Sequence, residues 1–245
     1  MNGKPRIETG IAGLDKMLSG GFISGTANLV RGAPGTGKTL LALQFLLRGA
    51  ERGEPGLLIS FEEFPLSLQN DAQAVGWDLS PWQEHGLLHL YFTSPEVLLK
   101  SLEAPAGPLS ELFVEKGIQR VVLDSVTHFT RIANEQQQLR SMYDRLINAL
   151  KRERTTALLL AEEGRLEAQH VERGNLSFVV DTIVLLRYVE VESAIQRAIA
   201  VMKMRGSDHV KEIRRYEIRR GGLVVTGPFE GRENILTGIS HRVSR

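Results

Sequence analysis

The sequence predicts an α/β fold, in which helices flank a mainly parallel central sheet and a C-terminal antiparallel β extension continues that sheet. Two patterns support this prediction. Up to Val189, short apolar segments alternate with helical segments, which is typical of a parallel sheet with helical connections. After Val189 the apolar segments are joined by Gly206-Ser207 and Gly221-Gly222, a pattern that indicates antiparallel strands linked by turns.

Strands are expected wherever apolar and β-branched residues gather between turn-forming residues. In chain order these segments are Thr26–Arg31, Gly56–Phe61, Leu87–Phe92, Arg120–Asp124, Thr156–Ala161 and Ile183–Val189, followed by Arg197–Arg205, Lys211–Arg219 and Leu223–Thr226. The clearest helix is Glu135–Arg152, because its apolar residues form one stripe that should pack on the sheet. That stripe consists of Leu139, Met142, Tyr143, Leu146, Ile147 and Leu150.

The bulk composition restricts both domain count and function class. A chain of 245 residues with 42% hydrophobic residues can bury a large core, and no linker divides it, so we expect a single domain over residues 1–245. The net charge of +1 gives no global attraction to nucleic acid or to an anionic membrane. No long apolar run or secretory signal is visible, so we expect a cytoplasmic protein that does not associate with membranes. The absence of Cys excludes disulfides and Cys-ligated metal centres.

Residues 32 to 39 read Gly-Ala-Pro-Gly-Thr-Gly-Lys-Thr, a phosphate-binding loop that lies between a predicted strand and a predicted helix. The glycines let successive backbone amides point at phosphate oxygens, and the start of the helix adds partial positive charge. Lys38 can reach the β and γ phosphates, and the Thr39 hydroxyl is placed to bind Mg²⁺. The expected nucleotide-binding residues here are Gly32, Ala33, Pro34, Gly35, Thr36, Gly37, Lys38, Thr39 and Leu40.

Two further segments end in acids where an open α/β sheet places its ligands. The strand Arg120–Asp124 has the form of a Walker B segment, so we expect the Asp124 carboxylate to hold Mg²⁺ together with Thr39. The strand Gly56–Phe61 ends in Glu62-Glu63, and at least one of these glutamates is expected to orient the attacking water. Adjacent side chains of an extended chain point to opposite faces, so the two cannot face the γ phosphate equally. The alternative is a solvated helix start before Pro65.

In the segment Val201–Gly206, the period of two in a strand places Lys203 and Arg205 on one face. Two cations that point the same way can neutralise charge on a transferring phosphoryl group. The alternative is an exposed strand edge that carries ordinary cations.

Together these segments resemble the KaiC branch of the RecA superfamily of ATPases over nearly the whole chain. Thr9–Asp15 with Gly20-Gly21 is similar to the lead-in segment of KaiC and RadA proteins, and Phe61-Glu62-Glu63 resembles the paired glutamates of KaiC domains. Leu123–Thr127 resembles their Walker B strand, Lys203–His209 matches their K-x-R-G-x-x-H segment, and residues 229–238 resemble the end of the second KaiC domain.

The resemblance implies a RecA-like P-loop NTPase core that binds ATP and Mg²⁺. It further implies a homo-oligomeric ring, most often a hexamer, in which ATP lies between neighbours and Lys203, Arg205 and His209 contact the nucleotide of the next subunit. Glu62 and Glu63 match residues that activate water or a substrate hydroxyl, and Lys38, Thr39 and Asp124 match the phosphate and Mg²⁺ ligands.

Two departures from the circadian clock KaiC bear on function. The clock protein has two such domains and this chain has one, so we do not expect a double ring within one polypeptide, nor clock timing. Where the second clock domain carries adjacent Ser and Thr phosphoacceptors, this chain has Ser177-Phe178. Ser177 is therefore a candidate phosphoacceptor, and serine autokinase activity is a hypothesis.

The leading functional prediction is a slow ATPase ring that regulates or signals to an unidentified protein partner. Two alternatives stay open: a RecA or RadA type protein that couples ATP to DNA binding, and a scaffold whose assembly follows nucleotide occupancy. Nucleic-acid binding is not favoured, because acids interrupt the basic clusters. These clusters are Lys211, Arg214 and Arg215, then Arg219 and Arg220, and finally Arg242 and Arg245.

Overall fold

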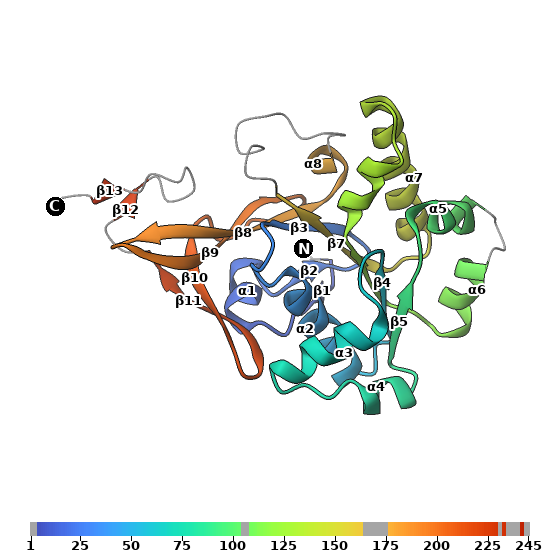
Figure 1. The fold of residues 1–245 in the computed structure, drawn as a ribbon, viewed down its shortest axis with the longest axis horizontal. Coiled ribbons are helices and arrows are strands. Elements are labelled where there is room, and N and C mark those ends of the chain that lie inside the picture. The colour runs from blue at the N-terminus through green and yellow to red at the C-terminus, as the bar shows by residue number, and fades with distance from the viewer. Residues whose placement is uncertain (1–3, 104–107, 164–175, 230–231, 234–240, 243–245) are drawn as a thin grey trace.

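A nine-stranded sheet runs through the centre of the computed structural model, which describes residues 4–103, 108–163, 176–229, 232–233 and 241–242 (Figure 1). Its strand order is β11-β10-β9-β8-β3-β7-β6-β4-β5, and the six strands from β8 to β5 are parallel. The strands are β3 (Ala27–Gly32), β4 (Gly56–Ser60), β5 (Leu88–Phe92), β6 (Arg120–Asp124), β7 (Thr156–Glu162), β8 (Thr182–Val191), β9 (Ala194–Met204), β10 (Arg214–Arg219) and β11 (Gly222–Pro228). Two small antiparallel pairs accompany this sheet: β1 (Arg6–Ile7) with β2 (Phe22–Ile23), and β12 (Arg232–Glu233) with β13 (His241–Arg242).

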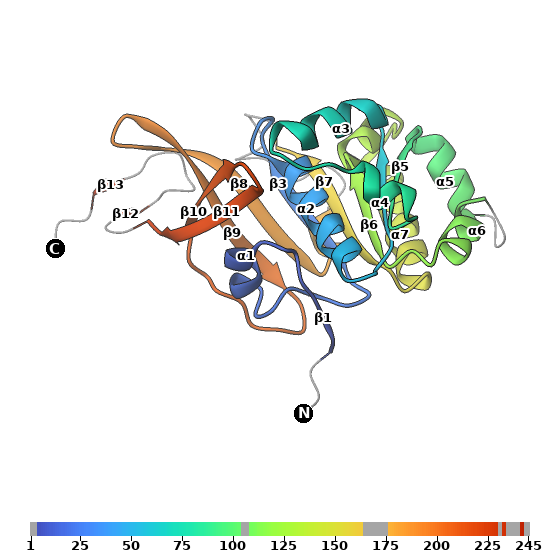
Figure 2. The same ribbon diagram turned by 90° about the horizontal axis from the view of Figure 1, so that it is seen from below.

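Helices cover both faces of the parallel strands (Figure 2). They are α1 (Ala12–Met17), α2 (Lys38–Glu51), α3 (Pro65–Ala74), α4 (Ser80–Glu84), α5 (Pro95–Glu103), α6 (Pro108–Glu115), the 3₁₀ helix η1 (Val126–Arg131), α7 (Gln136–Arg152) and α8 (Leu176–Val179). Alternate strand residues point to opposite faces, so Val122 packs with α1, α2 and α3 while Val121 and Leu123 pack with α5, α6 and α7. This double burial explains why the parallel strands read as continuous apolar runs.

The predicted α/β class with an antiparallel extension is confirmed, and the predicted strands lie where expected, with small differences at their ends. β10 begins at Arg214 instead of Lys211. The hairpin of β8 and β9 is longer than predicted, because its strands extend to Val191 and from Ala194 instead of ending at Val189 and starting at Arg197. Glu192 and Ser193 form its turn with φ of 53° and 61°. Such turns usually contain Asn or Gly. Because neither residue is present here, the sequence did not indicate a tight turn.

A buried ion pair ties β6 to the loop after α2. Arg120 is fully buried, its Nε donates to Glu54 Oε2 at 2.8 Å, and its Nη1 donates to the carbonyls of Glu8 and Phe45 at 2.7 Å. Replacing Arg120 by Met should lower the free energy of unfolding by about 3–5 kcal/mol, because Glu54 Oε2 and two carbonyls lose the buried guanidinium that donates to them.

The matched control is Arg52→Met, since Arg52 also pairs with Glu54, at 3.1 Å, but is about half exposed. We expect that variant to lose less than about 1 kcal/mol. Urea unfolding of both variants measures the difference, and equal losses would contradict the account of Arg120.

Candidate phosphate and magnesium site

The glycine-rich loop between β3 and α2 has a conformation that requires glycine. Gly35 and Gly37 have φ of 77° and 90°, in the left-handed region that other residues rarely adopt. A Cβ on Gly32 would lie 2.6 Å from the Leu186 carbonyl oxygen, so the loop could not keep its path with a larger residue. A loop of this backbone conformation suits a bound phosphate chain, because its successive amides can point at phosphate oxygens.

Lys38 is the first residue of α2, and its side chain is buried in this loop. Its Nζ donates to the Ala33 carbonyl at 3.2 Å. Burial lowers the pKa of Lys38 from its usual value, while the nearby charges of Glu162, Asp124 and Glu62 act in the opposite direction. A desolvated ammonium group held by a single carbonyl can exchange that contact for stronger ones with phosphate oxygens.

Thr39 and Asp124 meet as the sequence predicts. The Thr39 hydroxyl donates to Asp124 Oδ2 at 2.7 Å, which joins the start of α2 to the end of β6. Burial raises the pKa of Asp124, and the Thr39 bond and the Lys38 charge oppose that shift. One carboxylate beside one hydroxyl fits Mg²⁺, which keeps several waters and takes further ligands from nucleotide phosphates.

Glu62 and Glu63 follow β4 and lie in different surroundings. The Ser60 hydroxyl accepts hydrogen bonds from both backbone amides, at 3.3 and 2.9 Å, and so shapes the turn after the strand. The Glu62 side chain is 62% exposed, and its Oε2 lies 3.2 Å from His128 Nε2 on η1. Glu63 Oε2 is buried and has no hydrogen-bond partner, and burial followed by the charges of Asp71 and Asp124 raises the pKa of Glu63.

Three contributors to this site escaped the sequence analysis. Glu162 ends β7 directly beside Gly32 of β3 and acts electrostatically on Lys38. His128 orients Glu62, and the Tyr216 hydroxyl on β10 donates to the Thr36 carbonyl of the loop at 2.6 Å. The acid at the end of β7 repeats the pattern of an apolar strand that leads into an acid, as in β4 and β6, and this pattern could have indicated Glu162. The other two depend on contacts between distant segments and carry no local signal.

Lys203 and Arg205 point the same way, but at the opposite edge of the sheet from the glycine-rich loop. Lys203 pairs with Ile183, which pairs with Leu29, the third residue of β3, whereas the loop begins at Gly32 at the end of β3. Lys203 Nζ donates to the Ser177 and Val180 carbonyls at 2.6 and 2.8 Å. Burial, and then the Arg205 charge, lowers the pKa of Lys203.

The remaining predicted residues also lie at this second edge. Arg205 Nη2 donates to the Phe178 carbonyl at 2.6 Å, and Ser177 belongs to α8, which directly precedes β8. His209 follows β9, and its Nδ1 is buried without a hydrogen-bond partner. The predicted site residues thus form two separate groups, one around Lys38 and one around Lys203 and Arg205. The motif at residues 234–238 lies outside the described residues.

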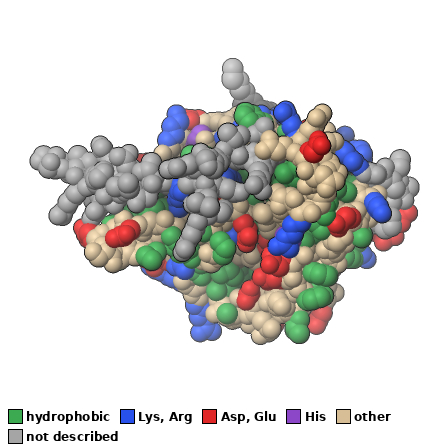
Figure 3. Space-filling model, turned by 45° about the horizontal axis from the view of Figure 1, so that its top comes forward, with side chains coloured by type: hydrophobic (Ala, Val, Ile, Leu, Met, Phe, Trp, Pro, Cys, Tyr) green, Lys and Arg blue, Asp and Glu red, His purple; other side chains and the backbone are tan. Residues whose placement is uncertain are grey.

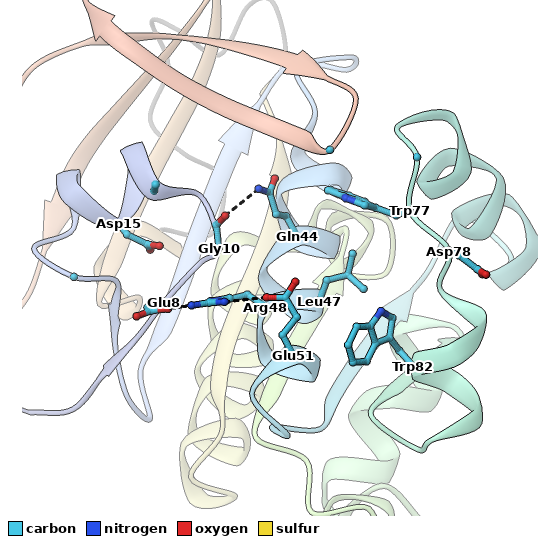
Figure 4. Close-up of a pocket in the computed structure, with 14 residues that line it drawn as sticks. Glu8, Gly10, Asp15, Gln44, Leu47, Arg48, Glu51, Trp77, Asp78 and Trp82 are labelled. Carbon is cyan, nitrogen blue, oxygen red and sulfur yellow. Dashed lines mark hydrogen bonds and ion pairs between the residues drawn. The ribbon is translucent and has the colours of Figure 1, made fainter.

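A separate cavity of about 670 Å³ lies beside the C-terminal half of α2 (Figure 4). Both tryptophans of the chain, Trp77 and Trp82, line it opposite Arg48, which binds Glu8. No residue of the glycine-rich loop lines this cavity, so it is separate from the candidate phosphate site.

A glycine-rich loop between strand and helix, with Lys38 and Thr39 opposite Asp124, defines a P-loop nucleotide-binding protein of the α/β class. A sequence model described as "ATPase: KaiC" matches residues 7–230. The chain therefore belongs to the KaiC family of ATPases, whose nucleotide is ATP.

Curated relatives agree with this assignment. The circadian clock oscillator protein KaiC of Picosynechococcus sp. is 34% identical over 241 residues, which are 98% of this chain and 46% of that protein. The circadian clock protein KaiC3 of Synechocystis sp. is 32% identical over 232 residues, which are 91% of this chain and 46% of that protein. The chain thus spans about half the length of the curated relatives that it matches. No helix among the described residues is long and apolar enough to cross a membrane.

Proposed function

We propose that this chain acts as a single KaiC-like domain, residues 1–245, that hydrolyses ATP slowly in a homo-oligomeric ring and signals its nucleotide state to a protein partner. The observation that carries the proposal is the separation of two charged groups. Carboxylates of Glu62, Asp124 and Glu162 lie near Lys38 where the parallel strands end, while Lys203 and Arg205 lie toward the other edge of the sheet, where these strands begin.

These two groups lie at opposite ends of the parallel strands, an arrangement that suits a head-to-tail contact between copies. Three strand positions separate the level of Lys203 from Gly32, about 10 Å at the usual rise per residue, and both cations point toward the carbonyls of residues 177–180 instead. A second copy would bring Lys203, Arg205 and His209 to the phosphates of its neighbour. Repetition of such a heterologous contact closes a ring when the rotation between copies permits it.

In this site Lys38 and the loop amides would hold the phosphates of ATP, and Thr39 and Asp124 would hold Mg²⁺. The metal supplies charge neutralisation of the β and γ phosphates when bound. Glu62 is the better placed carboxylate to accept a proton from the attacking water, because it is accessible, is oriented by His128 and lies within the field of Lys38. Lys203 and Arg205 of the next copy would stabilise the charge of the transition state.

The direct test measures the solution mass by light scattering, with and without Mg-ATP, and phosphate release from the same samples. The proposal predicts a shift to a ring of about six subunits, with turnover below the ~10 s⁻¹ of a typical enzyme. A persistent monomer that hydrolyses ATP at an ordinary enzymatic rate would contradict it.

Replacing Glu62 by Gln should lower the turnover number about 10²–10⁴-fold, because the variant loses the group that accepts the proton. Glu63→Gln is the matched control, since it makes the same change at the neighbouring, more buried position, and we expect a smaller loss. Both variants should still bind Mg-ATP and assemble. A larger loss in Glu63→Gln would assign the role to Glu63 instead.

A second candidate activity is phosphorylation of Ser177. Ser177 lies in α8, beside the cations proposed to reach the next copy, so its hydroxyl would approach the nucleotide of a neighbour and not its own. Incubation with Mg-ATP followed by mass spectrometry should then show one phosphate on Ser177 and none in Glu62→Gln rings. An unmodified Ser177 in rings that hydrolyse ATP would remove this activity.

DNA binding has less support from the distribution of charge. Arg214 pairs with Glu212 at 2.9 Å and Arg219 pairs with Glu217 at 2.6 Å, so an acid offsets one cation in each of these two basic clusters. Figure 3 shows charges of both signs interspersed on the visible face. Stimulation of the ATPase by single-stranded DNA, with affinity that falls steeply with salt, would restore this alternative.

The scaffold alternative requires nucleotide binding for assembly but does not require hydrolysis. A ring of Glu62→Gln, Glu63→Gln chains should assemble in both cases. The slow-ATPase proposal predicts that this ring loses its cellular role, whereas a scaffold would keep it.

A further inference from the structure

We infer that Phe178 of one copy packs against the exposed Phe64–Phe92 ring pair of the next copy and so forms an apolar anchor beside the shared ATP site. The inference rests on the proposed function, in which copies of this chain meet head to tail. The inference adds the specific contact that determines how neighbouring copies align.

The first half of the contact lies at the edge of the sheet that carries the glutamates. Phe64 directly follows Glu62-Glu63 and precedes α3, and Phe92 is the last residue of β5. The two rings lie 4.2 Å apart at an interplanar angle of 31°, yet they are 62% and 42% exposed. This ring pair forms an apolar surface in a defined geometry, and exposing that surface to water is unfavourable.

The second half lies at the opposite edge. The Phe178 side chain is 63% exposed, while Leu176 and Val180 on either side are buried in the core. Those two buried residues fix the short helix α8, and Arg205 binds the Phe178 carbonyl. The backbone is therefore held while the ring points outward, an arrangement that suits an anchor because little conformational freedom is lost on binding.

The charges beside each aromatic group identify the occupant as a second copy of this chain. Phe64 lies next to the carboxylates Glu62 and Glu63, and Phe178 lies next to the cations Lys203 and Arg205. One edge thus combines rings with negative charge, and the other combines a ring with positive charge. The same approach that brings Arg205 to the nucleotide of a neighbour brings Phe178 toward Phe64.

Cysteine cross-linking tests this contact, because the chain contains no Cys and gives no background. The variant Phe64→Cys, Phe178→Cys is assembled with Mg-ATP, oxidised mildly and run on a non-reducing gel. We expect a ladder of covalent oligomers that ends at the ring size. The control variant Val114→Cys, Phe178→Cys places one thiol on Val114 of α6, which is 78% exposed, and should stay monomeric on the gel.

A second measurement uses Phe64→Ala, Phe178→Ala and the double variant, each checked for an unchanged melting temperature. We expect each single change to raise the concentration needed for half assembly about 10- to 100-fold, as for interface anchors, and the double change to add little more. Val114→Ala is the control and should have no effect. The inference would be overturned if the effects of Phe64→Ala and Phe178→Ala on assembly added independently and the cysteine variant formed a ring of the original size without a cross-linked ladder. That result would leave the proposed function intact. Failure of the original chain to assemble with Mg-ATP would instead contradict the proposed function.

Discussion

Replacement of Lys38 by Ala should reduce the affinity for Mg-ATP by at least about 100-fold, because the loop loses its only buried cation among the described residues near the phosphates. The nearby carboxylates of Glu62, Asp124 and Glu162 would then act on the nucleotide without the opposing charge of Lys38. Titration calorimetry measures the change, and phosphate release should fall to background.

Lys16→Ala provides the control for this prediction. Lys16 is an exposed lysine on α1, so its removal makes the same change in net charge away from the loop. We expect unchanged affinity for Mg-ATP in that variant. If Lys38→Ala bound Mg-ATP as tightly as the original chain, the nucleotide site would have to lie elsewhere.

Replacement of Arg205 by Ala should reduce the turnover number about 10³-fold, which is the lower range for cations that stabilise a transferring phosphoryl group. Binding of Mg-ATP to the separated subunit should change little, because Arg205 lies at the edge of the sheet opposite its own glycine-rich loop. Lys203→Ala should behave in the same way. Single-turnover kinetics and calorimetry separate these two quantities.

Arg219→Ala is the control, since Arg219 is an exposed arginine paired with Glu217 on β10. Its removal should leave turnover unchanged. A loss of affinity equal to the loss of turnover in Arg205→Ala would mean that Arg205 supports folding or binding within its own chain.

The sequence was sufficient for features that depend on neighbouring residues. The glycine pattern of residues 32–37 specifies a loop of unusual backbone conformation, and apolar runs that end in Asp124 or Glu62 specify buried parallel strands with acids at one edge. Since parallel strands end at the same edge, the meeting of Thr39 with Asp124 followed from the strand pattern.

Features that depend on tertiary contacts were beyond the sequence. The bond from Tyr216 to the Thr36 carbonyl joins residues 180 positions apart, and the Glu54–Arg120 pair joins residues 66 positions apart. The period of two placed Lys203 and Arg205 on one face but could not say which edge of the sheet they occupy. Only the register of β9 on β8, and of β8 on β3, assigns them to the edge opposite the loop.

If each ATP site is completed by a neighbouring copy, a mixture of two inactive variants should recover activity. Lys38→Ala chains lack a working loop but keep Arg205, and Arg205→Ala chains keep the loop. In an equal mixture, about one quarter of the interfaces in a randomly assembled ring would pair an intact loop with an intact Arg205. We expect about one quarter of the original phosphate release after mixing in Mg-ATP. A mixture that forms mixed rings but stays as inactive as its two components would show that a neighbouring copy does not complete the site.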